Sequence, residues 1–461
     1  MPMNKKHIRF PLLFGILQLL FLILFFFNCF RYYYNSTQNY WFSHNYLYPA
    51  AVVLAVISVV IYRKYYLQDF RYYVLFFLWS LLTTLIRYLV FKDNSDFSYN
   101  FQLLTAIFVA LPLIAAFPKK TCLWFLRLLM SVCVLFLTLA GIIALVFVVG
   151  NLVLLNPYDN QQIFGLIKIT GSYRLAMWAN PNLVGMTYMT ALWLSVYLAS
   201  FCKKSIHKGL FSFCGIINWL VLLLSDSRTC LYAFAVSFSL YLAYRYFHSD
   251  LKSSFSNRGY STAVVAVACF FAVLLLDCLA LDSVRLVRSV ISPLIDPNRL
   301  FSSLLQISSS SGIGADRPLT TVTQGRLLIW INAVKTIIKY PYILLIGTSV
   351  SEVANVIRYY SPYLYPHLHN SWLHILLAYG IIGLVLALTA VFHSLKTMAR
   401  QLFVFFDSLP AELKMMPFIV LAILLTSLLE SSLFNLSNII YFENTWFFIL
   451  IGYCAVYPKL S

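Results

Sequence analysis

The chain alternates between long runs of apolar residues and short polar segments that hold most of its charges. A helix needs about 20 predominantly apolar residues to cross the hydrocarbon core of a bilayer, and most of the runs meet this length. The pattern therefore predicts an all-α fold, a polytopic membrane protein of about 12 transmembrane helices. The predicted spans are residues 10–30, 47–62, 72–91, 101–117, 128–155, 183–201, 209–225, 229–247, 261–280, 371–393, 417–434 and 440–457.

These spans divide the chain into three parts. Transmembrane helices 1–9 occupy residues 1–280, and helices 10–12 occupy residues 371–461. Between them lies a long polar segment, residues 281–370, which we expect to form a large, partly helical loop on the outer face. Within it, residues 325–340 place apolar side chains at helical spacing, so that this stretch is predicted to be an amphipathic helix.

The composition excludes a water-soluble protein. Hydrophobic residues make up 61% of the chain and charged residues only 10%, whereas soluble chains are about a quarter charged. The formal net charge of +18 does not indicate nucleic-acid binding, because Lys and Arg occur in small clusters between apolar runs rather than along one face. We expect no nucleic-acid partner.

The clusters of Lys and Arg predict the topology instead, because such clusters mark cytoplasmic loops. With the N-terminus inside, 19 of the 33 Lys and Arg residues fall in inner segments and 5 in the short outer loops. Arg87 lies within the third span near its outer end, where it is expected to snorkel to the headgroups. The first run is too long for a signal peptide. We expect a multi-pass protein of the bacterial plasma (inner) membrane with both termini cytoplasmic.

Several familiar sites are missing from the sequence. The nine Cys residues are scattered and form no Cys-x-x-Cys pair, so that neither a disulfide framework nor a zinc site is indicated. The sequence also lacks Asp-x-Asp, a phosphate loop and a Gly-x-Ser-x-Gly motif. We therefore expect no metal and no cofactor.

Four polar stretches map to the predicted outer face. Each has an ordinary structural interpretation, as a helix cap, a turn at the headgroups or a close-packing glycine, but together they converge on one side of the membrane and favour a functional site there. They are residues 173–185 with Arg174, Asn180 and Asn182, the turn Ser225-Asp226-Ser227-Arg228, residues 325–330 with Arg326, and His369-Asn370 followed by Gly380 and Gly383.

The order of these stretches resembles that of the O-antigen ligase and polymerase superfamily of bacterial membrane glycosyltransferases. His-Asn-x9-Gly-x2-Gly is similar to the ligase motif of this family, and Thr229-Cys230 departs from the small residue usual after its Ser-Arg turn. The matching positions are His369, Asn370, Gly380 and Gly383 for the motif, Arg228 for the Ser-Arg turn, Arg326 for the basic residue at the start of the loop helix, and Asn180-Pro181-Asn182 for the Asn-Pro-Asn triplet.

The resemblance implies a metal-independent glycosyltransferase of cell-surface polysaccharide or lipopolysaccharide biosynthesis. Its donor would be a glycan on a polyprenyl (undecaprenyl) diphosphate, and its acceptor would be a hydroxyl of a glycan, lipid or protein. The protein would also contact membrane lipids. Ligase and repeat-unit polymerase differ mainly in the acceptor, and the sequence leaves both open. An alternative of a different class is a transporter or flippase of a lipid-linked or anionic substrate.

The proposed chemistry assigns roles to individual residues. A departing diphosphate needs positive charge, and the planar arginine fork binds phosphate oxygens in pairs, so that Arg326 and Arg228 are the candidate catalytic cations. His369 is the candidate base for the acceptor hydroxyl, with His367 and His374 as rivals. Substrate-binding or supporting residues are expected at Arg174, Asn180, Asn182, Asn370 and Glu430.

Overall fold

The computed structural model confirms the predicted class, an all-helical polytopic membrane protein. Seven helices of its described part are long and apolar enough to cross a membrane, while the number of twelve spans stays a prediction. The structure describes residues 5–31, 43–91, 97–150, 152–155, 162–169, 172–177, 181–248, 258–291, 305–307, 319–353, 355, 368–404, 409–435 and 442–460.

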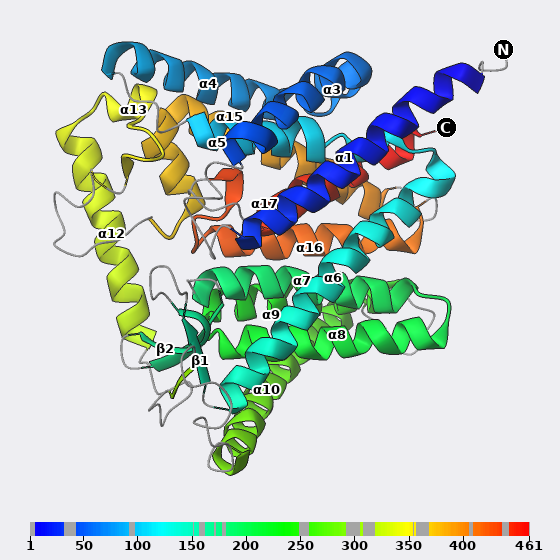
Figure 1. Ribbon diagram of the computed structural model, residues 1–461, viewed down its shortest axis with the longest axis vertical. Helices are drawn as coiled ribbons and strands as arrows, with labels where there is room; N and C mark the ends of the chain where they lie inside the picture. Colours follow the sequence, from blue (N-terminus) through cyan, green and yellow to red (C-terminus); the bar gives the residue numbers. More distant parts are fainter. Residues whose placement is uncertain are drawn as a thin grey trace. The chain divides into compact units, whose positions relative to one another are not determined.

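Every predicted span contains a helix (Figure 1). The α-helices are α1 (Lys5–Arg31), α3 (Tyr48–Gln68), α4 (Arg71–Phe91), α5 (Phe97–Leu104), α6 (Lys119–Val149), α7 (Pro181–Phe201), α8 (Ser205–Leu224), α9 (Arg228–Phe247), α10 (Arg258–Ile291), α12 (Leu319–Lys339), α13 (Ile343–Ile346), α15 (Ser371–Phe403), α16 (Ala411–Ser427) and α17 (Phe442–Val456). Shorter π and 3₁₀ turns are η1 (Ser43–Leu47), η2 (Thr105–Ala110), η3 (Leu113–Ala116), η7 (Leu433–Asn435) and η8 (Tyr457–Lys459).

A small antiparallel sheet is the main feature that the sequence did not predict. Its strands are β1 (Leu152–Leu155), β2 (Gln162–Ile169), β3 (Ser172–Met177) and β4 (Leu305–Ile307), in the order β3-β2-β1-β4. The predicted fifth span was therefore too long, because its last residues form β1. The pairing of Val153 with Gln306 joins segments far apart in the chain, a partnership that local hydrophobic patterns cannot reveal.

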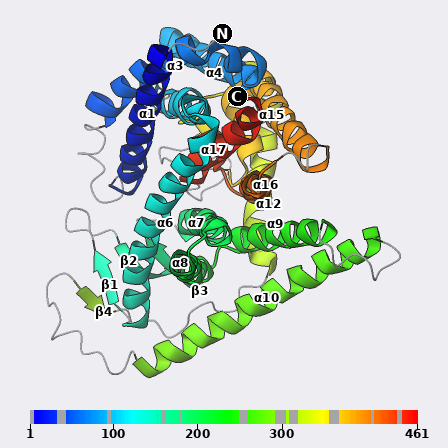
Figure 2. The same cartoon turned by 90° about the vertical axis from the view of Figure 1, so that its right-hand side faces the viewer.

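The described chain falls into two compact units. The first unit comprises residues 1–126, 318–417 and 427–461, and the second unit comprises residues 127–317 and 418–426. The first unit therefore holds α12, α15 and the Glu430 segment. The second unit holds the sheet and helices α7 to α10, which Figure 2 shows in green.

In the first unit, helix α15 is broken at Gly380 where it packs against α4 and α13. Gly380 has a φ of 71°, a left-handed conformation that suits glycine. The break exposes backbone carbonyls that need donors, since none can be left unpaired in a membrane. Thr348 N donates to the Leu377 carbonyl at 2.6 Å, and Trp79 Nε1 donates to the Tyr379 carbonyl at 2.8 Å.

Arg87 supplies the third donor at this break. Its Nη2 donates to the carbonyls of Ala378 at 2.8 Å and Ile346 at 3.0 Å, and the residue is buried. The prediction that Arg87 snorkels to the headgroups was therefore wrong. A buried guanidinium is tolerated here because two carbonyls of a broken helix and a short neighbouring helix turn toward it.

In the second unit, α7 packs along α8 and also contacts α9. Hydrogen bonds between buried polar side chains fix their register. Asn218 Nδ2 donates to Ser195 Oγ at 3.1 Å, and Trp193 Nε1 donates to Ser237 Oγ at 3.2 Å. Because α7 and α8 run in opposite directions, the turn after α8 lies at the same end as the start of α7, where Gly185 meets Ser227.

Candidate functional site

Glu430 joins two of the predicted catalytic residues in the first unit. Its Oε1 accepts a hydrogen bond from Arg326 Nη2 at 2.5 Å, and its Oε2 lies 2.9 Å from His369 Nδ1. The Glu430 side chain is 1% exposed, whereas those of Arg326 and His369 are 16% and 17% exposed. Of the three, Arg326 and His369 are therefore the groups that a substrate could touch. Glu430 is buried beneath them and binds both.

The hydrogen bond to Glu430 also determines which imidazole nitrogen of His369 can accept a proton. In neutral imidazole one ring nitrogen carries the hydrogen and the other a lone pair. A carboxylate oxygen accepts from Nδ1–H, so this contact favours the tautomer with the lone pair on Nε2. The same arrangement of carboxylate, imidazole and substrate hydroxyl serves proton transfer in hydrolases.

Two chain segments meet at this cluster through Asn370 and Ser371. Asn370 caps α15, because its Oδ1 accepts from Leu373 N at 2.9 Å, and its Nδ2 donates to the Leu428 carbonyl at 2.9 Å. Ser371 Oγ donates to the Glu430 carbonyl at 2.8 Å. Asn370, predicted to bind substrate, thus uses both ends of its side-chain amide to bind protein backbone, and its visible role is to position His369 and Glu430.

His369 itself has an unusual backbone conformation. Its φ is 50°, in the left-handed region that residues other than glycine seldom adopt. The conformation turns the chain sharply before α15 begins at Ser371, and the hydrogen bonds of Asn370 and Ser371 hold it there. Backbone strain of this kind, sustained by surrounding contacts, is concentrated at functional sites.

Helix α12 brings Arg326 to the cluster and is itself tied to the His369 segment. Trp330 lies one turn after Arg326, on the same face, and its Nε1 donates to the Leu368 carbonyl at 3.1 Å. This face of α12 continues through buried Ile329 and Ala333. The third and fourth polar stretches, which the sequence could not connect, therefore meet in the first unit.

The opposite face of α12 carries an exposed apolar stripe. The apolar residues that predicted an amphipathic helix are between 40% and 73% exposed, so they do not pack into the protein core. A helix of a membrane protein with such a face can lie along the bilayer interface. The residues of the stripe are Leu327, Leu328, Ile331, Val334 and Ile338.

In the second unit, Arg174 connects the first and second polar stretches. Arg174 is a residue of β3 and is 6% exposed. Its Nε donates to the Ser225 carbonyl at 2.8 Å, and its Nη2 donates to Asn182 Oδ1 at 2.7 Å and to the Asp226 carbonyl at 3.1 Å. Arg174 and Asn182 thus hold the turn that precedes Arg228, and their contacts are structural.

The turn between α8 and α9 also requires Gly185. A Cβ atom at Gly185 would lie 2.3 Å from Ser227 Cβ, closer than real side chains approach. Arg228 is the first residue of α9, its side chain is 31% exposed, and its Nε lies 3.9 Å from Asp226 Oδ1. Arg228 belongs to the second unit, and its catalytic role stays a prediction.

Three further residues were predicted as site residues or as alternative bases. Asn180 and His367 lie outside the described residues. His374, the second rival base, is 1% exposed within α15 and is thus a core residue. Within the part of the chain that the structure describes, no three His, Cys, Asp or Glu side chains gather as a set of metal ligands.

Ser371 and Trp330 are positioning residues that no sequence pattern assigned. Trp330 simply follows Arg326 by four residues, and Ser371 follows His369-Asn370 in the sequence. A serine at the start of a helix is an ordinary cap signal, which gives no hint that its hydroxyl would bind the segment of Glu430.

Comparison with known families agrees with the geometry. Residues 213–388 match the family model described as O-antigen ligase. This match supports the resemblance of the chain to the O-antigen ligase-like superfamily. The resemblance predicted from the sequence is thereby confirmed. The matching segment is well under half of the chain and contains Arg228, Arg326, His369 and Gly380. Arg174 and Glu430 lie outside it. Among curated proteins there is no significant match.

The match supports an O-antigen ligase- or polymerase-like membrane function in polysaccharide biosynthesis. Members of the family are glycosyltransferase-like ligases and polymerases. Lipid-linked glycans and glycan acceptors are the general partners of the family.

Proposed function

We propose that this O-antigen ligase-like protein transfers a glycan from a polyprenyl (undecaprenyl) diphosphate carrier to an acceptor hydroxyl. The observation that supports the proposal is the bridge by which Glu430 holds Arg326 and His369 at 2.5 and 2.9 Å. The bridge presents a cation and a candidate base side by side, and the proposed reaction needs one group of each kind. We place the reaction at the outer face of the bacterial plasma membrane, with both termini cytoplasmic.

In the proposed reaction, His369 Nε2 accepts the proton of the acceptor hydroxyl. The acceptor oxygen then forms a bond to the anomeric carbon, and the bond from that carbon to the diphosphate oxygen breaks. The electron pair of the broken bond leaves with the diphosphate. The products are the new glycoside, polyprenyl diphosphate and protonated His369, whose positive charge Glu430 stabilises.

Arg326 has the complementary role of meeting the charge that develops on the diphosphate. A guanidinium carries five N–H donors in a rigid plane, so the ion pair with Glu430 fixes its orientation while using only part of its donor capacity. A fixed donor aimed at developing charge costs no reorganisation during the reaction. This is why we assign Arg326, rather than a flexible lysine, to the leaving group.

Transfer of labelled glycan tests the proposal directly. The purified protein in liposomes is given a radiolabelled polyprenyl-diphosphate glycan and acceptor fractions from the host, without nucleotide sugar or ATP. We expect label to appear in a new glycosidic bond, and we expect a chelator to leave the rate largely unchanged because guanidinium groups neutralise the diphosphate. Movement of the intact lipid-linked glycan across the bilayer without a new bond would favour a transporter instead.

A further inference from the structure

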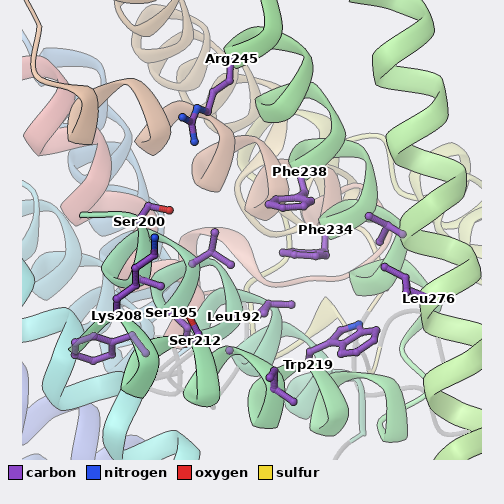
Figure 3. Close-up of a pocket in the computed structure, with 16 residues that line it drawn as sticks. Leu192, Ser195, Ser200, Lys208, Ser212, Trp219, Phe234, Phe238, Arg245 and Leu276 are labelled. Carbon is purple, nitrogen blue, oxygen red and sulfur yellow. The ribbon is translucent and has the colours of Figure 1, made fainter. Parts of the chain in front are cut away.

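The second unit contains a cavity that the proposed reaction does not use. Its volume is about 610 Å³, and it lies between helices α7, α8, α9 and α10. Figure 3 shows Phe234 and Phe238 on one wall, Trp219 and Leu276 along another, and Lys208 and Arg245 among the lining residues. The cavity is therefore mostly apolar, with two cationic side chains.

The two cations that line the cavity come from different helices. Lys208 is in the first turn of α8, and Arg245 is in the last turn of α9. Figure 3 shows both side chains on the side of the cavity away from Trp219 and Leu276. Trp219 lies eleven residues after Lys208 on α8, which corresponds to about 16 Å along the helix, so the cavity has one cationic end and a long apolar interior.

The described residues of α8 and α9 place no acidic side chain beside Lys208 or Arg245. Among residues 201–248, all of which the structure describes, the only acidic residue is Asp226, at the other end of the helices. No acidic side chain of the described residues forms an ion pair with Lys208 or Arg245. Lys203 and Lys204, in the short connection between α7 and α8, add further positive charge.

The interior of the cavity suits an apolar ligand. A void lined by Leu192, Phe234, Phe238 and Leu276 offers water few hydrogen-bond partners, and an empty void forfeits the dispersion contacts of its lining. Helix α10, which forms one side, buries little of its surface within the protein, so a membrane lipid can reach the cavity beside it. A ligand with an apolar chain and an anionic head would match the apolar interior and the two cationic side chains of the cavity.

We propose that this cavity binds one anionic glycerophospholipid, its phosphate on Lys208 and Arg245 and an acyl chain between Phe238, Trp219 and Leu276. The site lies at the end of the helices that our topology places in the cytoplasmic leaflet, where anionic lipids attract basic residues. The proposal stands on the cavity and its charges and does not depend on the glycosyl-transfer reaction.

Native mass spectrometry of the full-length protein in detergent tests this site. Dioleoyl phosphatidylglycerol is titrated into delipidated protein, with dioleoyl phosphatidylcholine as the neutral comparison. We expect the affinity of the first phosphatidylglycerol to fall about fivefold for Lys208→Gln or Arg245→Gln and about thirtyfold for both together. Gly215→Leu should weaken both lipids, because a Cβ at Gly215 meets only ordinary contacts at 3.6 Å or more and the larger side chain takes up cavity space.

The matched control is the double variant Lys203→Gln/Lys204→Gln. It removes the same charge from the same end of the helices without altering the cavity lining, so we expect the affinity for phosphatidylglycerol to stay within about twofold. An equal loss in this control, or equal binding of phosphatidylcholine by the unaltered protein, would overturn the proposal. So would displacement of phosphatidylglycerol by equimolar undecaprenyl phosphate, which would make the cavity a carrier-lipid site.

Discussion

His369 Nδ1 lies 2.9 Å from Glu430 Oε2, although 61 residues separate the two in the chain. The contact gives His369 a defined tautomer and a partner for the charge that it gains on accepting a proton. Without Glu430, an imidazole and a guanidinium would lie close together with no carboxylate between them. Glu430, which the sequence suggested only as a supporting residue, thus stands at the centre of the cluster.

Glu430→Gln tests this bridge. The amide keeps the shape of the carboxylate but loses its charge, so it no longer stabilises protonated His369 or fixes Arg326 by an ion pair. We expect transfer to fall by about a hundredfold in membranes, normalised to inserted protein. Glu412→Gln, a change of the same kind at the start of α16, is the control and should keep its rate. Full transfer by Glu430→Gln would reduce the bridge to a structural contact.

His369→Gln should remove the base while leaving a polar side chain in place. We expect the transfer rate at neutral pH to fall by about a hundredfold to ten-thousandfold. Because hydroxide can then deprotonate the acceptor in place of the imidazole, the residual rate should rise steadily with pH. A residual rate that does not change with pH would contradict the role of His369 in proton removal.

Arg326→Lys keeps the positive charge but loses the planar fork. A lysine serves well as a headgroup anchor, but it cannot bind Glu430 and a diphosphate oxygen in the same fixed geometry. We expect a loss of about a hundredfold to a thousandfold in transfer with near-normal insertion, and the same for Arg228→Lys. Lys339→Arg, at the exposed end of α12, should have no effect. Near-normal transfer by both arginine variants would favour the transporter.

Arg174→Lys should act on stability rather than on catalysis. A lysine cannot reproduce the hydrogen bonds to the carbonyls of Ser225 and Asp226 and to Asn182, and at least one buried acceptor would lose its donor at a cost of about 1–3 kcal/mol. We expect a lower melting temperature of the purified protein and less inserted protein. Any protein that does insert should transfer glycan at a near-normal rate, and a selective loss of rate would instead place Arg174 at the substrate.

Gly380→Ala tests whether this motif glycine is structural. Its φ of 71° is unfavourable for alanine, and a Cβ would lie 2.4 Å from the Leu345 carbonyl oxygen, so α13 and α15 could not keep their contact. We expect the variant to lose several kcal/mol of stability and to insert poorly. Gly209→Ala, whose Cβ meets nothing within 4 Å, should be as stable as the unaltered protein or more so. Equal stability of both variants would contradict this interpretation.

Much of the architecture follows from the sequence because the membrane imposes a local rule. Every backbone polar group within lipid must be satisfied inside its own segment, so an apolar run of sufficient length becomes a helix whatever its neighbours are. This is why α4, α7 and α9 begin and end close to their predicted bounds. The motif spacing at His369, Asn370, Gly380 and Gly383 likewise depends on nearby residues, and it was enough to point to the family.

Contacts between distant segments could not be predicted in this way. The sequence marked Arg326, His369 and Glu430, but their bridge forms because Trp330, Asn370 and Ser371 tie three separate segments together. The sequence placed Arg87 at the headgroups, whereas the tertiary structure turns it toward the carbonyl of Ala378 at the break in α15 and that of Ile346 at the end of α13. Hydrophobic periodicity reports only which side chains avoid water, while the partner of each polar group is decided by which backbone and side-chain atoms the fold brings within hydrogen-bonding distance.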